Sequence, residues 1–169
     1  MQKKIKKEIN RHTNVKCKTL KLDLSNSSFI KKIKKLKKID FIFYFATIKI
    51  TSTKIFNFEL YKRYKKIYCS NFYKMCKIVN QISSSKIKVF FPSTIFINEK
   101  QKKYSEYVRA KKDSEKIIKK INKNLRRVKV ISFRLPVMNT SQNISILNQN
   151  KKNSQNLLIP IIKNFIKND

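Results

Sequence analysis

The sequence predicts a protein of the α/β class, in which helices flank a parallel sheet. Short apolar runs alternate with longer stretches whose apolar residues recur at helical spacing, which is typical of strand–helix units. The chain has 169 residues, of which 41% are hydrophobic, enough for one domain with a core. It contains no glycine, which excludes every site built on a glycine-rich loop. We therefore expect an ordinary α/β core without a P-loop or a G-x-G-x-x-G turn.

The first part of the chain is expected to hold two strands with a helix between them. Residues 15–22 read as the first strand. Ser25 or Asn26 then stands where a residue can cap the following helix. The apolar positions of that helix are Phe29, Ile33 and Leu36. Residues 39–46 are almost continuously apolar, which is typical of a strand buried on both faces.

The same alternation continues toward the C-terminus. We expect a long helix over residues 59–82, a strand over 87–91 that Pro92 ends, a second long helix over 107–125 and a strand over 128–135 that Pro136 stops. Residues 1–140 are therefore predicted to form one domain. Residues 141–169 are predicted to be a C-terminal tail with a short apolar segment interrupted by Pro160.

The charge of the chain is strongly unbalanced. Lys and Arg number 42 against 9 Asp and Glu, for a formal net charge of +33. Because nearly all of these cations are lysines in a sequence also rich in Ile and Asn, codon bias in an AT-rich genome accounts for the composition without selection for a partner. A field of this strength still attracts nucleic acid and anionic lipid non-specifically. Drift is the favoured interpretation, and a selected polyanion site is the alternative.

Cysteine and histidine offer little chemistry. Cys17, Cys69 and Cys76 contain no C-x-x-C pair, and His12 is the single histidine, so neither a zinc site nor a nucleophile–histidine triad is predicted. We expect free thiols, no metal and a cytoplasmic protein. The longest apolar run, residues 41–46, is far shorter than the roughly 20 residues of a membrane-spanning helix.

One group of residues suggests acid/base chemistry. Tyr107 and Lys111 are separated by four positions at the start of an expected helix, so they lie on one face. A cationic neighbour can stabilise a phenolate and make a tyrosine usable as an acid or base. Ser93 and Thr94 follow an expected strand, at the sheet edge where open parallel sheets bind ligands.

These residues resemble the short-chain dehydrogenase/reductase family, including the related NAD-dependent epimerases and dehydratases. That family has a Ser or Thr after its fifth strand, a Tyr-x-x-x-Lys helix and an Arg-x-Pro or Pro-Gly step after its sixth strand. The corresponding residues here are Ser93 or Thr94, Tyr107 with Lys111, and Arg134, Leu135 and Pro136. Further positions in matching order are Asp23, Leu24 and Ser25 beside the adenine, Phe45, Ala46 and Thr47 beside the cofactor, and Asn71 in the proton relay.

The resemblance implies a partial Rossmann-like fold and a role for each site residue. Tyr107 would be the general acid/base, and Lys111 would lower its pKa and hold the nicotinamide ribose. Thr94 or Ser93 would hydrogen-bond the reacting oxygen of a small-molecule substrate, and Pro136 would pack near the nicotinamide of NAD or NADP. Each also has a purely structural interpretation, such as a helix anchor for Tyr107 or a backbone-bound amide for Asn71.

The resemblance also implies that the family's first strands and glycine-rich turn are missing. We therefore expect a truncated or degenerate oxidoreductase, inactive alone, with a separately encoded N-terminal fragment or a homo-oligomer supplying what is lacking. The alternative is a basic RNA-binding or ribosome-associated protein. Because the aromatic residues fall in expected strands and on inner helix faces, the enzyme-like interpretation is favoured.

Overall fold

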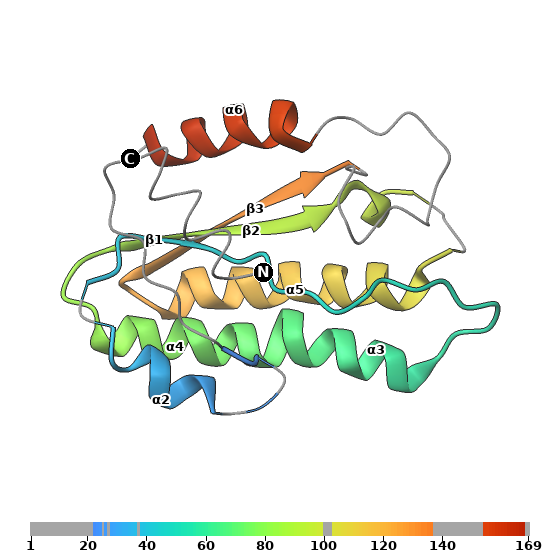
Figure 1. The fold of residues 1–169 in the computed structure, drawn as a ribbon, viewed down its shortest axis with the longest axis horizontal. Coiled ribbons are helices and arrows are strands. Elements are labelled where there is room, and N and C mark those ends of the chain that lie inside the picture. Colours follow the sequence, from blue (N-terminus) through green and yellow to red (C-terminus); the bar gives the residue numbers. More distant parts are fainter. Residues whose placement is uncertain are drawn as a thin grey trace, which may run out of the picture.

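A three-stranded parallel sheet lies at the centre of the protein, with helices on both faces (Figure 1). The computed structural model describes residues 22–136, except 25, 27, 37 and 100–102, and residues 154–167. In chain order the elements are α2 (Phe29–Ile33), β1 (Phe41–Phe43), α3 (Phe58–Lys65), the π-helical segment η1 (Lys66–Asn71), α4 (Phe72–Ile82), β2 (Ile87–Thr94), the 3-10 turn η2 (Ile95–Ile97), α5 (Ser105–Asn124), β3 (Val128–Leu135) and α6 (Ser154–Lys167).

The α/β prediction is confirmed, and several elements fall close to their predicted positions. Strand β3 covers the predicted residues 128–135, and α5 begins two residues before the predicted start at 107. The predicted long helix is also present, as the continuous run of α3, η1 and α4. The strand order is β1-β2-β3, so the chain adds each strand beside the previous one. The strand expected at 15–22 lies almost wholly outside the described residues.

Strand β2 continues through Pro92, where the sequence predicted an end. The amide of Lys88 donates to Asp40, and the carbonyl of Phe90 accepts from Tyr44, so the even-numbered backbone groups of β2 face β1. The β1 pairing stops at Phe43 opposite Phe90. Pro92 is also even-numbered, so its nitrogen, which carries no hydrogen, faces the β1 side after the pairing with β1 has ended. No hydrogen bond to β1 is therefore lost, and β2 continues to Thr94 beside β3.

Two predicted N-terminal elements are shorter than expected. The strand predicted over 39–46 is limited to three residues, because pairing with β2 ends there. Helix α2 ends at Ile33, so Leu36 lies beyond the helix and is exposed. Asn26 does not cap the helix: its side-chain oxygen accepts the amide of Ser28, which precedes the first helical residue. Ser25 lies outside the described residues.

The π-helical segment η1 is an irregularity that the apolar spacing did not predict. In a π-helical turn the bonded N–H and carbonyl are five residues apart instead of four, so the turn contains one extra residue. Its residues Ile67, Tyr68, Cys69 and Asn71 are all buried. The hydroxyl of Tyr44 donates to the carbonyl of Ile67 at 2.8 Å. The segment thus widens the buried face of the long helix beside α5 and β1.

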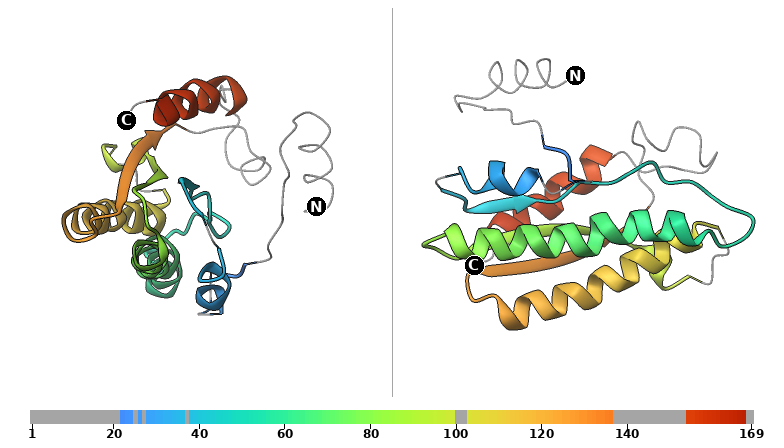
Figure 2. Two further views of the ribbon diagram at one scale, coloured as in Figure 1. Left: turned by 90° about the vertical axis from the view of Figure 1, so that its left-hand side faces the viewer. Right: turned by 90° about the horizontal axis from the view of Figure 1, so that it is seen from below.

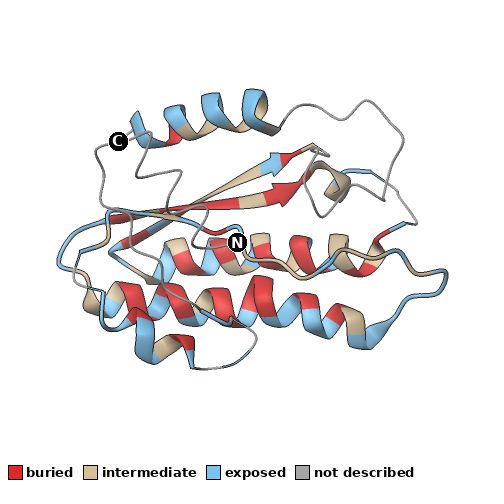
Figure 3. Ribbon diagram, in the orientation of Figure 1, coloured by how far each residue is buried: buried red, intermediate tan, exposed pale blue. Residues whose placement is uncertain are grey.

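The two faces of the sheet are covered unequally (Figures 1 and 3). Helices α3, α4 and α5 lie along one face, with α2 outside α4, and the main core fills this layer. Of the described elements, helix α6 is the one on the other face, where Phe165 packs on four aromatic rings of the strands. Those rings are Phe41, Phe43, Phe90 and Phe133. Among the described residues, the layer of α3, α4 and α5 holds the main core, whereas Phe43 and Phe45 on the other face are partly exposed.

The turn into α5 has a left-handed backbone at a bulky residue. Tyr104 has φ 63° and ψ 28°, a conformation that costs a non-glycine residue about 1 kcal/mol or more. Its ring stacks on Phe96 with centroids 6.4 Å apart and is buried. Tyr104 is the one residue with positive φ among those the structure describes. A chain without glycine has therefore used a tyrosine at this turn and compensated with ring packing.

Candidate active site

The predicted hydroxyl pair lies at the carboxyl end of β2, buried between β3 and α5. Ser93 and Thr94 are the last two residues of the strand, at 4% and 5% exposure. They pair in register with Arg134 and Leu135 of β3. The predicted placement of these hydroxyls at a strand end is therefore correct, with the strand three residues longer than expected.

Tyr107, in the first turns of α5, reaches the end of β2. Its phenol lies close enough to the Thr94 side chain, thirteen residues earlier in the chain, for Thr94 to lower its pKa. The ring packs edge-on against Tyr64 and Tyr68 of the long helix, with centroids 5.9 Å away in both cases. Burial raises the pKa of the Tyr107 phenol, and the neighbouring Thr94 side chain offsets part of that rise. The structure thus brings Tyr107 and Thr94 together and keeps the phenol protonated at neutral pH.

Lys111, one turn further along α5, points its amine into the protein. The Nζ donates to the carbonyl of Pro92 at 2.6 Å and lies 4.0 Å from the ring centre of Tyr68. Phe91 forms a second aromatic contact at 4.6 Å, and the Tyr107 ring centre is 5.8 Å away. Burial lowers the pKa of Lys111 to about 7, although Cys69 and Glu115 act in the opposite direction. Tyr107 and Lys111 share a helix face, as predicted, and the amine contacts the tyrosine ring.

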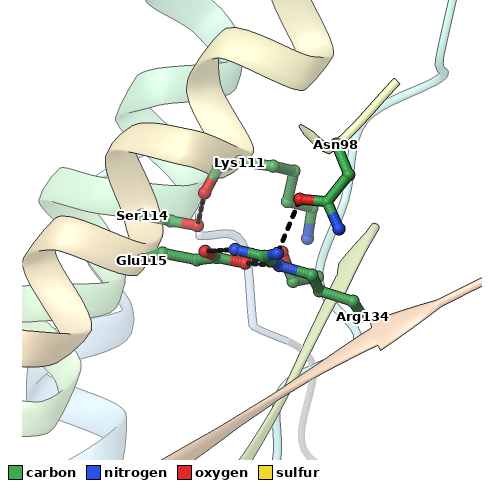
Figure 4. A network of polar contacts seen from close by, with 6 residues as sticks. Asn98, Lys111, Ser114, Glu115 and Arg134 are labelled. Carbon is green, nitrogen blue, oxygen red and sulfur yellow. Dashed lines mark hydrogen bonds and ion pairs between the residues drawn. The ribbon is translucent and has the colours of Figure 1, made fainter. Parts of the chain in front are cut away.

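A polar network centred on Glu115 of α5 includes Arg134 and Asn98 (Figure 4). Ser93 donates to Oε1 of Glu115 at 2.8 Å. Arg134 forms a forked ion pair with the same carboxylate, at 2.9 Å and 2.6 Å, and donates to Asn98 at 2.8 Å. Hydrogen bonding to Arg134, in the first place, and to Ser93 holds the pKa of Glu115 below its usual range despite partial burial. Because Ser93 is engaged in this way, Thr94 is the hydroxyl that remains beside Tyr107.

Sequence reasoning missed Tyr64, Tyr68 and Glu115 as parts of this site. The two tyrosines bind the segment that follows β1: Tyr68 pairs with the hydroxyl of Thr47, and Tyr64 donates to the carbonyl of Lys49 at 3.0 Å. Both lie on the apolar stripe of the long helix, where the sequence pattern indicates a core role. The spacing of four between Lys111 and Glu115 on α5 is the signal by which Glu115 could have been found.

The residues that the resemblance assigned to the proton relay and to the cofactor make contacts within the protein or are partly buried. Asn71 donates its side-chain amide to the carbonyl of Leu24, so two predicted site residues meet through a backbone contact. Asp23 accepts from Asn26 at 2.7 Å. Phe45 is 46% exposed with its ring on Phe90. Thr47, besides its contact with Tyr68, donates to Ile48 at 2.9 Å; Ala46 and Pro136 are half-buried.

Other sequence expectations bear on the site's surroundings. Cys69 and Cys76 are free and buried, as expected, whereas Cys17 lies outside the described residues. None of the helices in the described ranges combines the length and apolarity needed to cross a bilayer.

Comparison with known proteins identifies the fold. No protein-family model matches the sequence, and no curated protein matches it. Solved structures do match. A short-chain dehydrogenase from Salmonella enterica serovar Typhi superposes with a TM-score of 0.78 at 10% identity, over 95% of this chain and 73% of that one. A short-chain dehydrogenase from Burkholderia cenocepacia, solved with NADP, superposes with a TM-score of 0.66 at 11% identity, over 78% of this chain and 58% of that one.

An alcohol dehydrogenase from Thermococcus sibiricus, solved with 5-hydroxy-NADP, gives a TM-score of 0.68 at 12% identity, over 82% of this chain and 62% of that one. The chain thus spans less than two thirds of the Burkholderia and Thermococcus enzymes. At these identities the comparisons establish the fold: a Rossmann-like α/β fold shared with short-chain dehydrogenases. The predicted resemblance is confirmed at that level, and the RNA-binding alternative is not favoured.

Proposed function

We propose that the protein is an NAD(P)-dependent oxidoreductase that interconverts a hydroxyl and a carbonyl on a small molecule. The observation that carries this proposal is that the Tyr107 phenol and the Thr94 side chain lie together at the carboxyl end of the central parallel strand, with Lys111 beside the Tyr107 ring. In open α/β sheets this edge is where ligands bind. A phenol and a second hydroxyl that meet there are suited to bind one substrate oxygen and to exchange a proton with it.

In the proposed reaction each residue has a separate task. Tyr107 donates the proton of its phenol to the oxygen of a carbonyl substrate, and takes it back in the reverse direction. Thr94 hydrogen-bonds the same oxygen and holds it beside the phenol. Lys111, 5.8 Å from the ring centre of Tyr107, stabilises the phenolate left after proton transfer. Glu115 and Arg134 fix the ends of β2 and β3 on which Thr94 depends.

The residues fit one end of a nicotinamide dinucleotide and not the other. The cofactor, when bound, supplies or accepts the hydride. The half-buried Ala46 and Pro136 are the residues that would hold its nicotinamide end, and the Lys111 amine would have to leave the Pro92 carbonyl to join them. The pyrophosphate is normally bound by a glycine-rich turn before a helix, and this chain has no glycine. A separately encoded N-terminal fragment would supply that turn.

Binding and turnover test different parts of the proposal. NADPH, NADH and a structured RNA are titrated separately against the full chain at physiological salt. We expect saturable dinucleotide binding. Tight, salt-resistant RNA binding without dinucleotide affinity would instead overturn the proposal in favour of the RNA-binding alternative.

Tyr107→Phe removes only the hydroxyl and tests its role directly. With a panel of small aldehydes and ketones, any NADPH oxidation should fall about 10²- to 10⁴-fold in this variant while NADPH affinity stays nearly unchanged. Tyr73→Phe, at a half-buried tyrosine of α4, is the matched control. Full turnover by Tyr107→Phe would remove Tyr107 from the mechanism. Dinucleotide binding without turnover by the unaltered chain would agree with the expectation that it is inactive alone.

A further inference from the structure

The segment that leads into α3 exposes three large apolar side chains at one end of the molecule (Figures 1 and 2). Ile55 is 85% exposed, Phe58 57% and Phe56 39%, and we call these three residues the loop patch. Figure 3 shows the tip of this segment coloured as exposed. Single exposed apolar residues are ordinary on protein surfaces, but three within four positions form a patch that indicates an interaction.

Cations surround the loop patch. The Lys62 amine lies 4.8 Å from the ring centre of Phe58, and the Arg109 guanidinium lies 5.5 Å from that of Phe56. Lys54 and Arg63 are exposed in the same stretch of chain. The exposed acidic group nearby, Glu59, forms an ion pair with Lys62 at 2.8 Å. The patch is therefore an apolar tip within a positively charged collar, on a protein of formal charge +33.

Hydrogen bonds to Glu106 of α5 hold the loop that carries the patch in place. The buried carboxylate of Glu106 accepts the hydroxyl of Thr53 and the amide of Asn57, both at 2.6 Å. The Asn57 side chain in turn caps α3 by accepting the amide of Leu60 at 2.9 Å. The loop patch is thus a preformed surface, with Ile55 and Phe56 anchored on both sides and Phe58 held in the first turn of α3.

We propose that the loop patch docks the protein onto an anionic lipid surface. Apolar side chains beside lysines and arginines are the combination that binds the headgroup boundary of a bilayer, where the former are buried and the latter meet anionic lipid. Docking of this kind is peripheral and needs no membrane-spanning helix. It is independent of the proposed oxidoreductase chemistry, because the patch uses none of the residues assigned to it.

The side chains favour lipid over the two other possible occupants. Nucleic acid bases would stack on aromatic faces, yet cations already lie over the Phe56 and Phe58 rings, and Ile55 has no aromatic face. A second copy of the chain joined through this patch by two-fold symmetry would bring two identical cationic collars together.

The first test removes the apolar tip. Full-length protein is floated with phosphatidylcholine vesicles that contain phosphatidylserine, and with vesicles of phosphatidylcholine alone. We expect binding to the anionic vesicles. Ile55→Ser and Phe58→Ser should each lower the affinity about tenfold, and the double variant Ile55→Ser with Phe58→Ser combines both losses. The matched control is Ile159→Ser with Ile166→Ser, at positions of α6 that are 50% and 44% exposed. Equal binding by the two double variants would overturn the proposal.

The second test separates position from total charge. Lys62→Gln with Arg109→Gln neutralises two cations of the collar, and Lys77→Gln with Lys123→Gln neutralises two exposed lysines elsewhere. The first pair should weaken vesicle binding about fivefold per cation relative to the second. Equal loss in both pairs would leave only unspecific charge attraction and refute docking through the patch.

The same variants report on the rejected occupants. If Ile55→Ser with Phe58→Ser lowers affinity for a structured RNA and leaves vesicle binding intact, the patch is a nucleic acid surface and the proposal fails. If the variant has half the solution mass of the unaltered protein in the absence of lipid, the patch joins two copies of the chain and the proposal likewise fails. Unchanged circular dichroism of the variant establishes that a loss of binding is not a loss of fold.

Discussion

The two faces of the sheet carry the same kind of residue in very different surroundings. On the face toward α3–α5, Phe91 is fully buried between Tyr44 and Phe72, with ring centroids at 5.8 Å and 4.7 Å. On the other face, Phe43 and Phe45 are 36% and 46% exposed, and a single helix covers their neighbours. The strands are apolar on both sides, but in the part of the chain that the structure describes one side has three helices as partners and the other has one.

This difference shows what strand composition can and cannot indicate. A nearly continuous apolar run predicts a strand with two apolar faces. It does not indicate how completely each face is covered, because coverage depends on helices supplied elsewhere in the chain. The site residues Thr94, Tyr107 and Lys111 all use the well-covered layer with α5, where side chains are held firmly enough to position a proton.

Removing an aromatic ring from the covered face should have the largest effect. Phe91→Ala deletes a fully buried ring from the main core, and we expect a loss of about 3–5 kcal/mol in the free energy of unfolding. Urea denaturation followed by circular dichroism measures it. The control, Phe45→Ala on the other face, should cost about 1 kcal/mol or less because its ring is already half in solvent. Equal losses would mean that the two faces contribute alike.

Removing the cap of the other face should have a smaller and more local effect. Phe165 is 3% exposed and contacts four strand rings, so Phe165→Ala should cost about 2–3 kcal/mol. Most of that loss should appear as opening of α6, because this helix reaches the sheet largely through one ring. Amide hydrogen exchange should show lost protection in α6 with protection in α5 and β3 retained. Uniform loss in all helices would contradict an independently docked α6.

The buried amine of the covered face should make stability depend on pH. Lys111 has a pKa of about 7 in the folded protein and about 10.4 when unfolded, so between these values the unfolded chain binds more protons. Stability should therefore rise as pH increases above about 7, by about 1 kcal/mol per pH unit from this group. Lys111→Met should remove that slope between about pH 7 and pH 7.5, where unfolded thiols, with a pKa of about 8.5, are still mostly protonated.

Denaturation midpoints across this pH window measure the Lys111 effect. Burial raises the pKa of Cys69 to about 11, so ionisation of unfolded thiols lowers stability at higher pH and has the opposite sign. Lys112→Met, at the exposed neighbouring lysine, should keep the slope of the unaltered protein. A slope that survives in Lys111→Met would show that another group titrates in this range.

Local pattern predicted most of the framework. The helix over 59–82 and the strand over 128–135 were recognisable because apolar spacing and flanking breakers agree along their whole length. The strand through Pro92 was predicted too short, because a proline in a parallel strand is tolerated when its missing N–H faces an unpaired side, and sequence does not give the pairing. The length of β1 depends on that same pairing.

For the candidate site, the sequence predicted the elements that carry the residues better than the contacts between them. Tyr107 and Thr94 meet, but which of Ser93 and Thr94 stands beside the phenol depends on Glu115 and Arg134, whose contact joins residues nineteen positions apart. The direction of the Lys111 amine likewise follows from the Pro92 carbonyl and the Tyr68 ring, which are brought together only by the packed fold. Long-range contacts of this kind have no local sequence signature.

Tyr104, the left-handed tyrosine before α5, has a consequence for the unfolded chain. A glycine there would relieve the folded backbone, but glycine also gives an unfolded polypeptide the greatest conformational freedom, which must be lost on folding. Each glycine replaced by a residue with a β-carbon reduces that loss by about 0.4–1 kcal/mol where the folded backbone permits it. By turning its chain with one strained tyrosine and otherwise with negative φ in the residues described, the protein folds from an ensemble of unusually low entropy.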